Sequence, residues 1–232
     1  GLIVIGILYL AVGIAFFILL PKPKYQRQRQ SGGLQLIKTF HTALANKKLL
    51  WIYLVAFLIM GSFVAVFNFI SYVLLAPPYS LSQTVVGLLF VVYLFGTFSS
   101  TYMGRLSDQH GNGRVLILGL LIMLTGGLLT LLQPLVFKFI GLAIFTFGML
   151  GSHSVACGWV GKLNHGDKAQ SSSMYMFFYY AGASSLGTLG GVFLESYGWS
   201  GVIGMVAAAV IICLLVVVRL ELAVSQHLLW HH

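Results

Sequence analysis

The chain has 232 residues, of which 59% are hydrophobic and 7% are charged. Ordinary globular domains hold about 45–50% apolar and about 25% charged residues. This composition therefore excludes a soluble domain and indicates an integral membrane protein. The formal net charge of +9 does not indicate nucleic-acid binding, because the 13 lysines and arginines are spread between apolar stretches and form no continuous groove.

Seven long stretches without Asp, Glu, Lys or Arg follow one another along the chain. A helix needs about 20 apolar residues to cross a bilayer core of about 30 Å, whereas a transmembrane strand needs about 9–11. The stretches therefore predict an all-α integral membrane protein with seven transmembrane helices. They cover residues 1–20, 49–76, 84–104, 115–137, 139–161, 169–194 and 196–218.

The segments outside these spans predict the topology. Residues 21–48 form a basic linker, whose part from Leu34 to Lys48 has the apolar spacing of a short interfacial helix. Residues 221–232 form a short, frayed tail. A cytoplasmic linker would place every basic residue except Lys138 on the cytoplasmic side, together with the C-terminus, as the positive-inside rule requires. Because Gly1 already lies in an apolar span, we expect a fragment that lacks an upstream part.

The connection after the third predicted span carries a motif of glycines, an acid and a base: Gly104, Leu106, Asp108, Gly111 and Arg114. We expect a tight, charged cytoplasmic turn here, in which the glycines let two helix ends approach. Asp108 would accept hydrogen bonds at the N-terminus of the next helix, where the helix dipole favours an anion. Arg105 and Arg114 would pair with it or with lipid phosphates. An ordinary turn would show the same residues.

This motif resembles the signature loop of the major facilitator superfamily, Gly-x-Leu-x-Asp-x-x-Gly followed by basic residues. The linker at 21–48 is similar to the central loop of that family. The resemblance implies that residues 1–20 end an absent N-terminal half. It also implies that residues 49–220 form a six-helix C-terminal half built from inverted three-helix repeats. Gln109, Asn112 and Gly113 stand where the family has basic residues.

Within the superfamily the chain is most similar to bacterial drug/proton antiporters. The residues that carry this similarity are 60–64, 151–155 and 182–191, followed by 197–199. The resemblance implies a multi-pass protein of the bacterial inner membrane that exports a small amphiphilic or drug-like compound, with protons as the coupling ion. Gly187 and Gly191, with Ser184 and Thr188 beside them, predict a face for close helix packing rather than for substrate contact. Such a face would also serve as a sliding surface.

Polar side chains inside the predicted spans occur four residues apart, so that each pair shares a helix face. In the resemblance, the second and fifth spans line the central cavity, and the third and sixth flank it. Tyrosine or asparagine in a span also serves as a contact between helices or as an interfacial anchor, and Tyr175 is interpreted in this way. The candidate substrate-binding residues are Asn68, Tyr72, Tyr93, Thr97, His153, Cys157 and Tyr179.

His153 is the one ionisable residue among His, Asp, Glu, Lys and Arg that lies well inside a predicted span. Ionisable groups inside a membrane are functional-site hypotheses by default, so His153 is the candidate for proton coupling. The alternative, which we weigh equally, is a neutral imidazole bonded to a serine or to the backbone.

Three classes of function compete. The leading hypothesis is a secondary transporter that works by alternating access, with the lipid bilayer, a small molecule, protons and the absent N-terminal half as partners. The alternative is a non-transporting scaffold or subunit that binds partners through its small-residue faces. An enzyme is not favoured, because the 4 acidic residues lie in loops or at span ends and no catalytic, metal or cofactor motif is present. An aromatic cavity lining predicts an amphiphilic or lipophilic substrate: Phe63, Phe67, Tyr72, Phe90, Tyr93, Phe177 and Tyr179.

Overall fold

The computed structural model describes residues 6–7, 9–10, 12–15, 46–163 and 168–229. The chain divides into two units, Gly1–Lys38 and Thr39–His232. The described residues of the first unit are helical and belong to the predicted span at 1–20. The predicted linker and interfacial helix at 21–48 lie outside the described residues except for 46–48, and Lys47 begins the first helix of the second unit.

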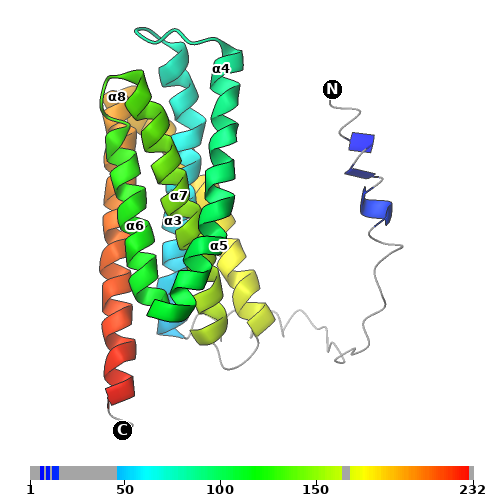
Figure 1. The fold of residues 1–232 in the computed structure, drawn as a ribbon, viewed down its shortest axis with the longest axis vertical. Coiled ribbons are helices and arrows are strands. Elements are labelled where there is room, and N and C mark those ends of the chain that lie inside the picture. Colours follow the sequence, from blue (N-terminus) through cyan, green and yellow to red (C-terminus); the bar gives the residue numbers. More distant parts are fainter. Residues whose placement is uncertain (1–5, 8, 11, 16–45, 164–167, 230–232) are drawn as a thin grey trace. The chain divides into compact units, whose positions relative to one another are not determined.

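The described part of the second unit is a bundle of helices (Figure 1). Five helical stretches are long and apolar enough to cross a membrane, and α4, η1 and α5 together make one of them. The elements are α3 (Lys47–Leu75), α4 (Gln83–Gly87), the 3₁₀ helix η1 (Leu88–Val91), α5 (Val92–His110), α6 (Asn112–Leu129), α7 (Leu135–Leu163) and α8 (Lys168–Leu229).

The last element, α8, holds two of the predicted spans. It has 62 residues, and a straight helix of that length would measure about 93 Å, three times the bilayer core. Gly198 breaks it with φ 64° and ψ −158°, a conformation that glycine adopts without a Cβ clash. Figure 1 shows the chain reversing direction here, so each arm, 168–197 and 199–229, is long enough for one crossing.

Glycines set how closely the helices pack. A Cβ atom at Gly126 of α6 would overlap the backbone nitrogen of Phe145 in α7, and one at Gly182 of α8 would overlap the backbone of α3. Such backbone contacts are typical of helix pairs in lipid, where apolar bulk gives no net drive to associate. Gly187 and Gly191 also face α3, where a Cβ would meet Val64 and Phe69 at 2.6 and 3.1 Å. The packing interpretation of these two glycines is confirmed.

The boundary predicted at Lys138 is wrong. The α6–α7 connection lies at residues 130–134, and Lys138 stands in the first turn of α7 with 4% of its surface exposed. Its Nζ atom donates a hydrogen bond to the carbonyl of Thr130, the C-cap residue of α6. The lysine therefore caps a helix C-terminus, where the dipole favours a cation, instead of marking a solvated loop.

Two further boundaries differ from the prediction. The motif is helical: Gly104, Leu106 and Asp108 belong to the last turns of α5, and Gly111 alone connects α5 with α6. The charged residues extend α5 past its apolar stretch, since nothing in them breaks a helix. The predicted fraying of the tail is wrong up to residue 229, because α8 continues as a helix to Leu229.

Candidate functional site

His153 of α7 is half-buried and faces two tyrosines of α8. Its Nδ1 atom is 3.0 Å from the hydroxyl oxygen of Tyr175. Its ring packs on Tyr179 with the centroids 4.5 Å apart. The hydrogen-bond partner of the imidazole is thus a tyrosine hydroxyl, and not the serine or backbone group that the alternative interpretation expected. We call His153, Tyr175 and Tyr179 the histidine cluster.

Tyr175 is the residue of this cluster that the sequence reasoning missed. Of its two interpretations, the interfacial anchor is wrong, because its side chain is fully buried, and the contact between helices is confirmed, because its hydroxyl meets His153 of α7. The signal was present in the sequence: Tyr175 and Tyr179 stand four residues apart and therefore share a face of α8. What the sequence did not show is that this face packs against the turn of α7 that carries His153.

A second cluster, which we call the aromatic cluster, joins three helices. Phe63 and Phe67 of α3 lie 5.4 and 5.0 Å from the ring of Tyr93 in α5. Phe63 also stacks on Phe145 of α7 at 6.2 Å. Tyr93 of this cluster lies near enough to Tyr179 of the histidine cluster for their charges to interact.

The other candidate residues lie on exposed faces or beside these clusters. Asn68 and Tyr72 share an exposed face of α3, and Tyr72 is 65% exposed. Thr97 is exposed and donates its hydroxyl to the carbonyl of Tyr93 in its own helix, at 3.3 Å. Cys157 is half-buried one turn after His153, as a free thiol within electrostatic range of Tyr175.

Two of the predicted lining aromatics need a separate remark. Phe177 is 55% exposed and packs edge-on against Phe178, at 5.6 Å between centroids. The side chain of Phe90 lies outside the described residues.

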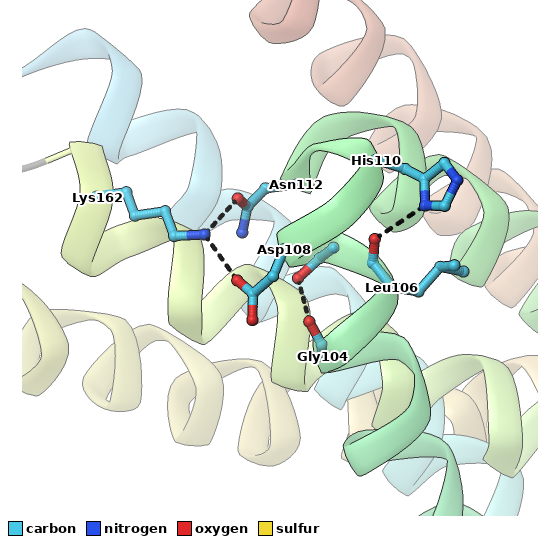
Figure 2. A network of polar contacts seen from close by, with 7 residues as sticks. Gly104, Leu106, Asp108, His110, Asn112 and Lys162 are labelled. Carbon is cyan, nitrogen blue, oxygen red and sulfur yellow. Dashed lines mark hydrogen bonds and ion pairs between the residues drawn. The ribbon is translucent and has the colours of Figure 1, made fainter.

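The motif residues form a polar network at one end of the bundle (Figure 2). The Nζ atom of Lys162, at the end of α7, donates to Asp108 Oδ1 and to Asn112 Oδ1, both at 3.1 Å. The expectation that Asp108 caps α6 is wrong, because Gly111 is the N-cap and no side chain bonds there. Asp108 pairs with Lys162 and not with Arg105 or Arg114, so the alternative pairing of these arginines with lipid phosphates stays a prediction.

The network connects α5, α6 and α7 through exposed side chains. Ser107 donates its hydroxyl to the carbonyl of Gly104 at 2.7 Å, and His110 approaches the carbonyl of Leu106 at 3.3 Å, both within α5 (Figure 2). Asn112 stands where the family has a basic residue, and it has a role in this network. Its amide oxygen accepts a hydrogen bond that a lysine or arginine could not accept.

A bundle of membrane-length helices with a polar motif at one end and clustered aromatic rings inside defines a polytopic membrane protein. The chain belongs to the Major Facilitator Superfamily, whose family model matches residues 62–228.

Three curated relatives are similar over most of this chain. The MFS-type transporter YybF of Bacillus subtilis (strain 168) is 42% identical over 212 residues, which cover 90% of this chain and 52% of that protein. The inner membrane transport protein YnfM of Escherichia coli (strain K12) is 40% identical over 221 residues, covering 95% and 53%. A transporter of Buchnera aphidicola subsp. Schizaphis graminum is 35% identical over 219 residues, covering 94% and 53%. The chain spans about half the length of the curated relatives it matches.

Proposed function

We propose that this chain is one half of a secondary transporter that works by alternating access in the bacterial inner membrane. The observation that carries the proposal is the histidine cluster: an ionisable ring among apolar helices, bonded to one buried tyrosine and packed on a second. Membership of the superfamily favours a transporter over the partner-binding scaffold. Substrate would bind near the midplane, between this half and a second one.

The substrate class follows from the interior of this half. The aromatic cluster offers ring faces and edges, and no ion pair reaches it in the described part of the chain. A carboxylate or phosphate would need an inward Arg or Lys to bind. These features support a small amphiphilic or drug-like substrate, and the similarity to drug/proton antiporters supports its efflux. Asn68, Tyr72 and Thr97 would then contact substrate from this half's exposed faces.

His153 would couple the transport to protons. Its half-buried ring can meet water on one side of the transport cycle and a closed interior on the other, which is what a coupling group requires. The orientation is supported by the basic residues at one end of the bundle. Lys47 begins α3, Lys168 begins α8, and Lys162 lies in the last turn of α7. The positive-inside rule makes that end cytoplasmic.

The test uses the protein at its natural length, reconstituted in lipid vesicles that contain a pH-sensitive dye. Ethidium, a planar amphiphilic cation, is added as the probe substrate, and Nile red serves as an uncharged probe. We expect probe-dependent proton movement, and we expect His153→Gln to abolish it while keeping a hydrogen-bonding side chain. His110→Gln is the matched control, because this exposed histidine lies in the motif end of α5.

The decisive comparison is the pH profile between about pH 5.5 and 8, with expression levels matched. Equal rates and equal profiles for His153→Gln and the parent protein would refute proton coupling through this residue. A further expectation concerns the 232-residue chain on its own, which supplies one wall of the proposed cavity. It should show no saturable uptake or efflux, and robust transport by it would contradict the half-transporter proposal.

A further inference from the structure

The hydroxyl of Tyr175 has two possible hydrogen-bond partners, and both belong to His153. The hydroxyl oxygen lies 3.0 Å from the ring atom Nδ1 and 3.4 Å from the backbone carbonyl oxygen of His153. Because Tyr175 is fully buried, its hydroxyl is shielded from bulk water. The place of the proton on the imidazole therefore decides which of the two bonds can form.

The two tautomers of the neutral ring differ in how many of these bonds they allow. With the proton on Nε2, the Tyr175 hydroxyl donates to Nδ1, and the carbonyl receives nothing from it. With the proton on Nδ1, this N–H donates to the Tyr175 oxygen, and the hydroxyl is free to donate to the carbonyl. The second arrangement forms both bonds at once, which favours it at a buried site.

Protonation of the ring separates the two arrangements further. An imidazolium carries hydrogen on both nitrogens. If Nδ1 were the acceptor of the Tyr175 hydroxyl, the incoming proton would face that O–H directly, and the buried hydroxyl would have to turn. If Nδ1 already carries its proton, neither bond changes when Nε2 gains one. Nε2 makes no hydrogen bond to a described residue. Since it is not among the buried atoms that lack a partner, Nε2 is not fully buried.

We propose that Tyr175 is a positioning residue that holds the proton of neutral His153 on Nδ1, so that Nε2 is the atom that gains and releases the coupled proton. This inference rests on the proposed function of His153. The titratable groups that face the ring are the phenols of Tyr175 and Tyr179 from α8, with Tyr93 of α5 near Tyr179 and Cys157 one turn along α7. Among the described residues, no Asp or Glu forms an ion pair with His153.

The experiment is nitrogen-15 NMR on the histidine-labelled protein at its natural length, in lipid vesicles at alkaline pH. The signals of His153 are those that His153→Gln removes. We expect a directly bonded proton on Nδ1 and none on Nε2. In Tyr175→Phe, which removes only the hydroxyl, the population of the Nδ1–H tautomer should fall by about half or more.

Tyr179→Phe is the matched control, since the Tyr179 ring packs on the same imidazole without a hydrogen bond to it. It should leave the tautomer unchanged. A parent protein with its proton on Nε2 overturns the inference, as does a Tyr175→Phe protein with the tautomer of the parent. If Tyr175→Phe does not fold, the parent signal alone decides. The tautomer is read without transport. If His153→Gln kept proton-coupled transport, the coupling role of His153 would fail and the tautomer result would still stand, and the reverse also holds.

Discussion

The two ends of the helical bundle are held by different kinds of contact. At the motif end, Lys162 joins Asp108 and Asn112 through side chains that stand in solvent, with the lysine 55% and the aspartate 73% exposed (Figure 2). At the opposite end, the carbonyl of Thr130 accepts hydrogen bonds from buried Lys138 and from Trp199 Nε1, the latter at 3.2 Å. One end has an exposed ion pair, and the other a shared, sheltered carbonyl.

The connections at the sheltered end are also tied to one another. The Tyr79 hydroxyl, from the α3–α4 connection, donates to the carbonyl of Gln133 in the α6–α7 connection. Lys138 lies over the Tyr79 ring, 5.8 Å from its centroid, as a cation–π contact. Trp199 follows directly after the break in α8 and also donates to Thr130 Oγ1 at 3.1 Å. Three separate connections therefore meet around Thr130.

The difference shows where the helical bundle can yield. An exposed ion pair contributes about 0–1 kcal/mol, so the motif end can open and close at low cost. A buried polar group that loses its partner costs about 1–3 kcal/mol, so the Thr130 end resists opening. The backbone contacts of α6 with α7 reach that end as well, since a Cβ at Gly141 would lie 2.8 Å from the carbonyl oxygen of Gly126. We expect this half to loosen first at the motif end.

The largest effect should come from forcing α6 and α7 apart near the Thr130 end. Gly126→Ala places a methyl group against the backbone of Phe145, and we expect a loss of about 3 kcal/mol in the free energy of unfolding. Gly127→Ala is the matched control, because its nearest neighbour would be a Phe145 ring atom at 3.6 Å. That change should stabilise the helix by about 0.5–1 kcal/mol. Thermal unfolding in detergent gives both values, and equal losses would contradict the close contact.

A smaller effect is expected from removing the charge of one lysine at each end. Lys138→Met keeps the length of the side chain but loses the bond to Thr130 and the contact with Tyr79, at a cost of about 2 kcal/mol. Lys162→Met at the motif end should cost less than about 1 kcal/mol. The same unfolding assay compares them. If the two variants lose the same stability, the contrast between the ends is wrong.

The smallest change in stability should follow Asp108→Asn, below about 1 kcal/mol, because the amide oxygen can still accept from Lys162. Its effect should be on the rate of transport. We expect turnover to slow with little change in substrate affinity, since Asp108 lies at the bundle end and in neither the histidine cluster nor the aromatic cluster. Binding and turnover are measured separately on the natural-length protein, at low and high salt. Salt should slow the parent more than the variant. Loss of binding at normal expression would disprove this assignment.

The sequence predicted helix existence well and helix ends less well. The span at 49–76 became α3 with a shift of two residues at its start, where Asn46 accepts from the backbone N–H groups of Lys48 and Leu49. A cut made at charged residues cannot show such caps. It also cannot tell a lysine in solvent from Lys138, whose charge is satisfied by a carbonyl, although Pro134 marked the true start of α7.

The site was predicted in part for a related reason. A span without other charges made His153 stand out, and spacing by four selected Tyr93 and Tyr179. Spacing along one helix does not say which faces of two helices meet, so Tyr175 was missed as the partner of the imidazole. The glycines of α6 and α7 were missed in the same way. Gly126 and Gly141 acquire their meaning from each other, across an interface that no single helix contains.

The break at Gly198 has a consequence for how this protein enters its membrane. A single residue joins the two arms of α8, so no loop separates them that could stay on the far side of the membrane while the second arm inserts. Backbone groups inside lipid must be paired within a helix. We therefore expect the arms to insert together as a helical hairpin, with Glu195 and Ser196 carried across at its tip. Lengthening the tip with a polar insert should let them insert one at a time.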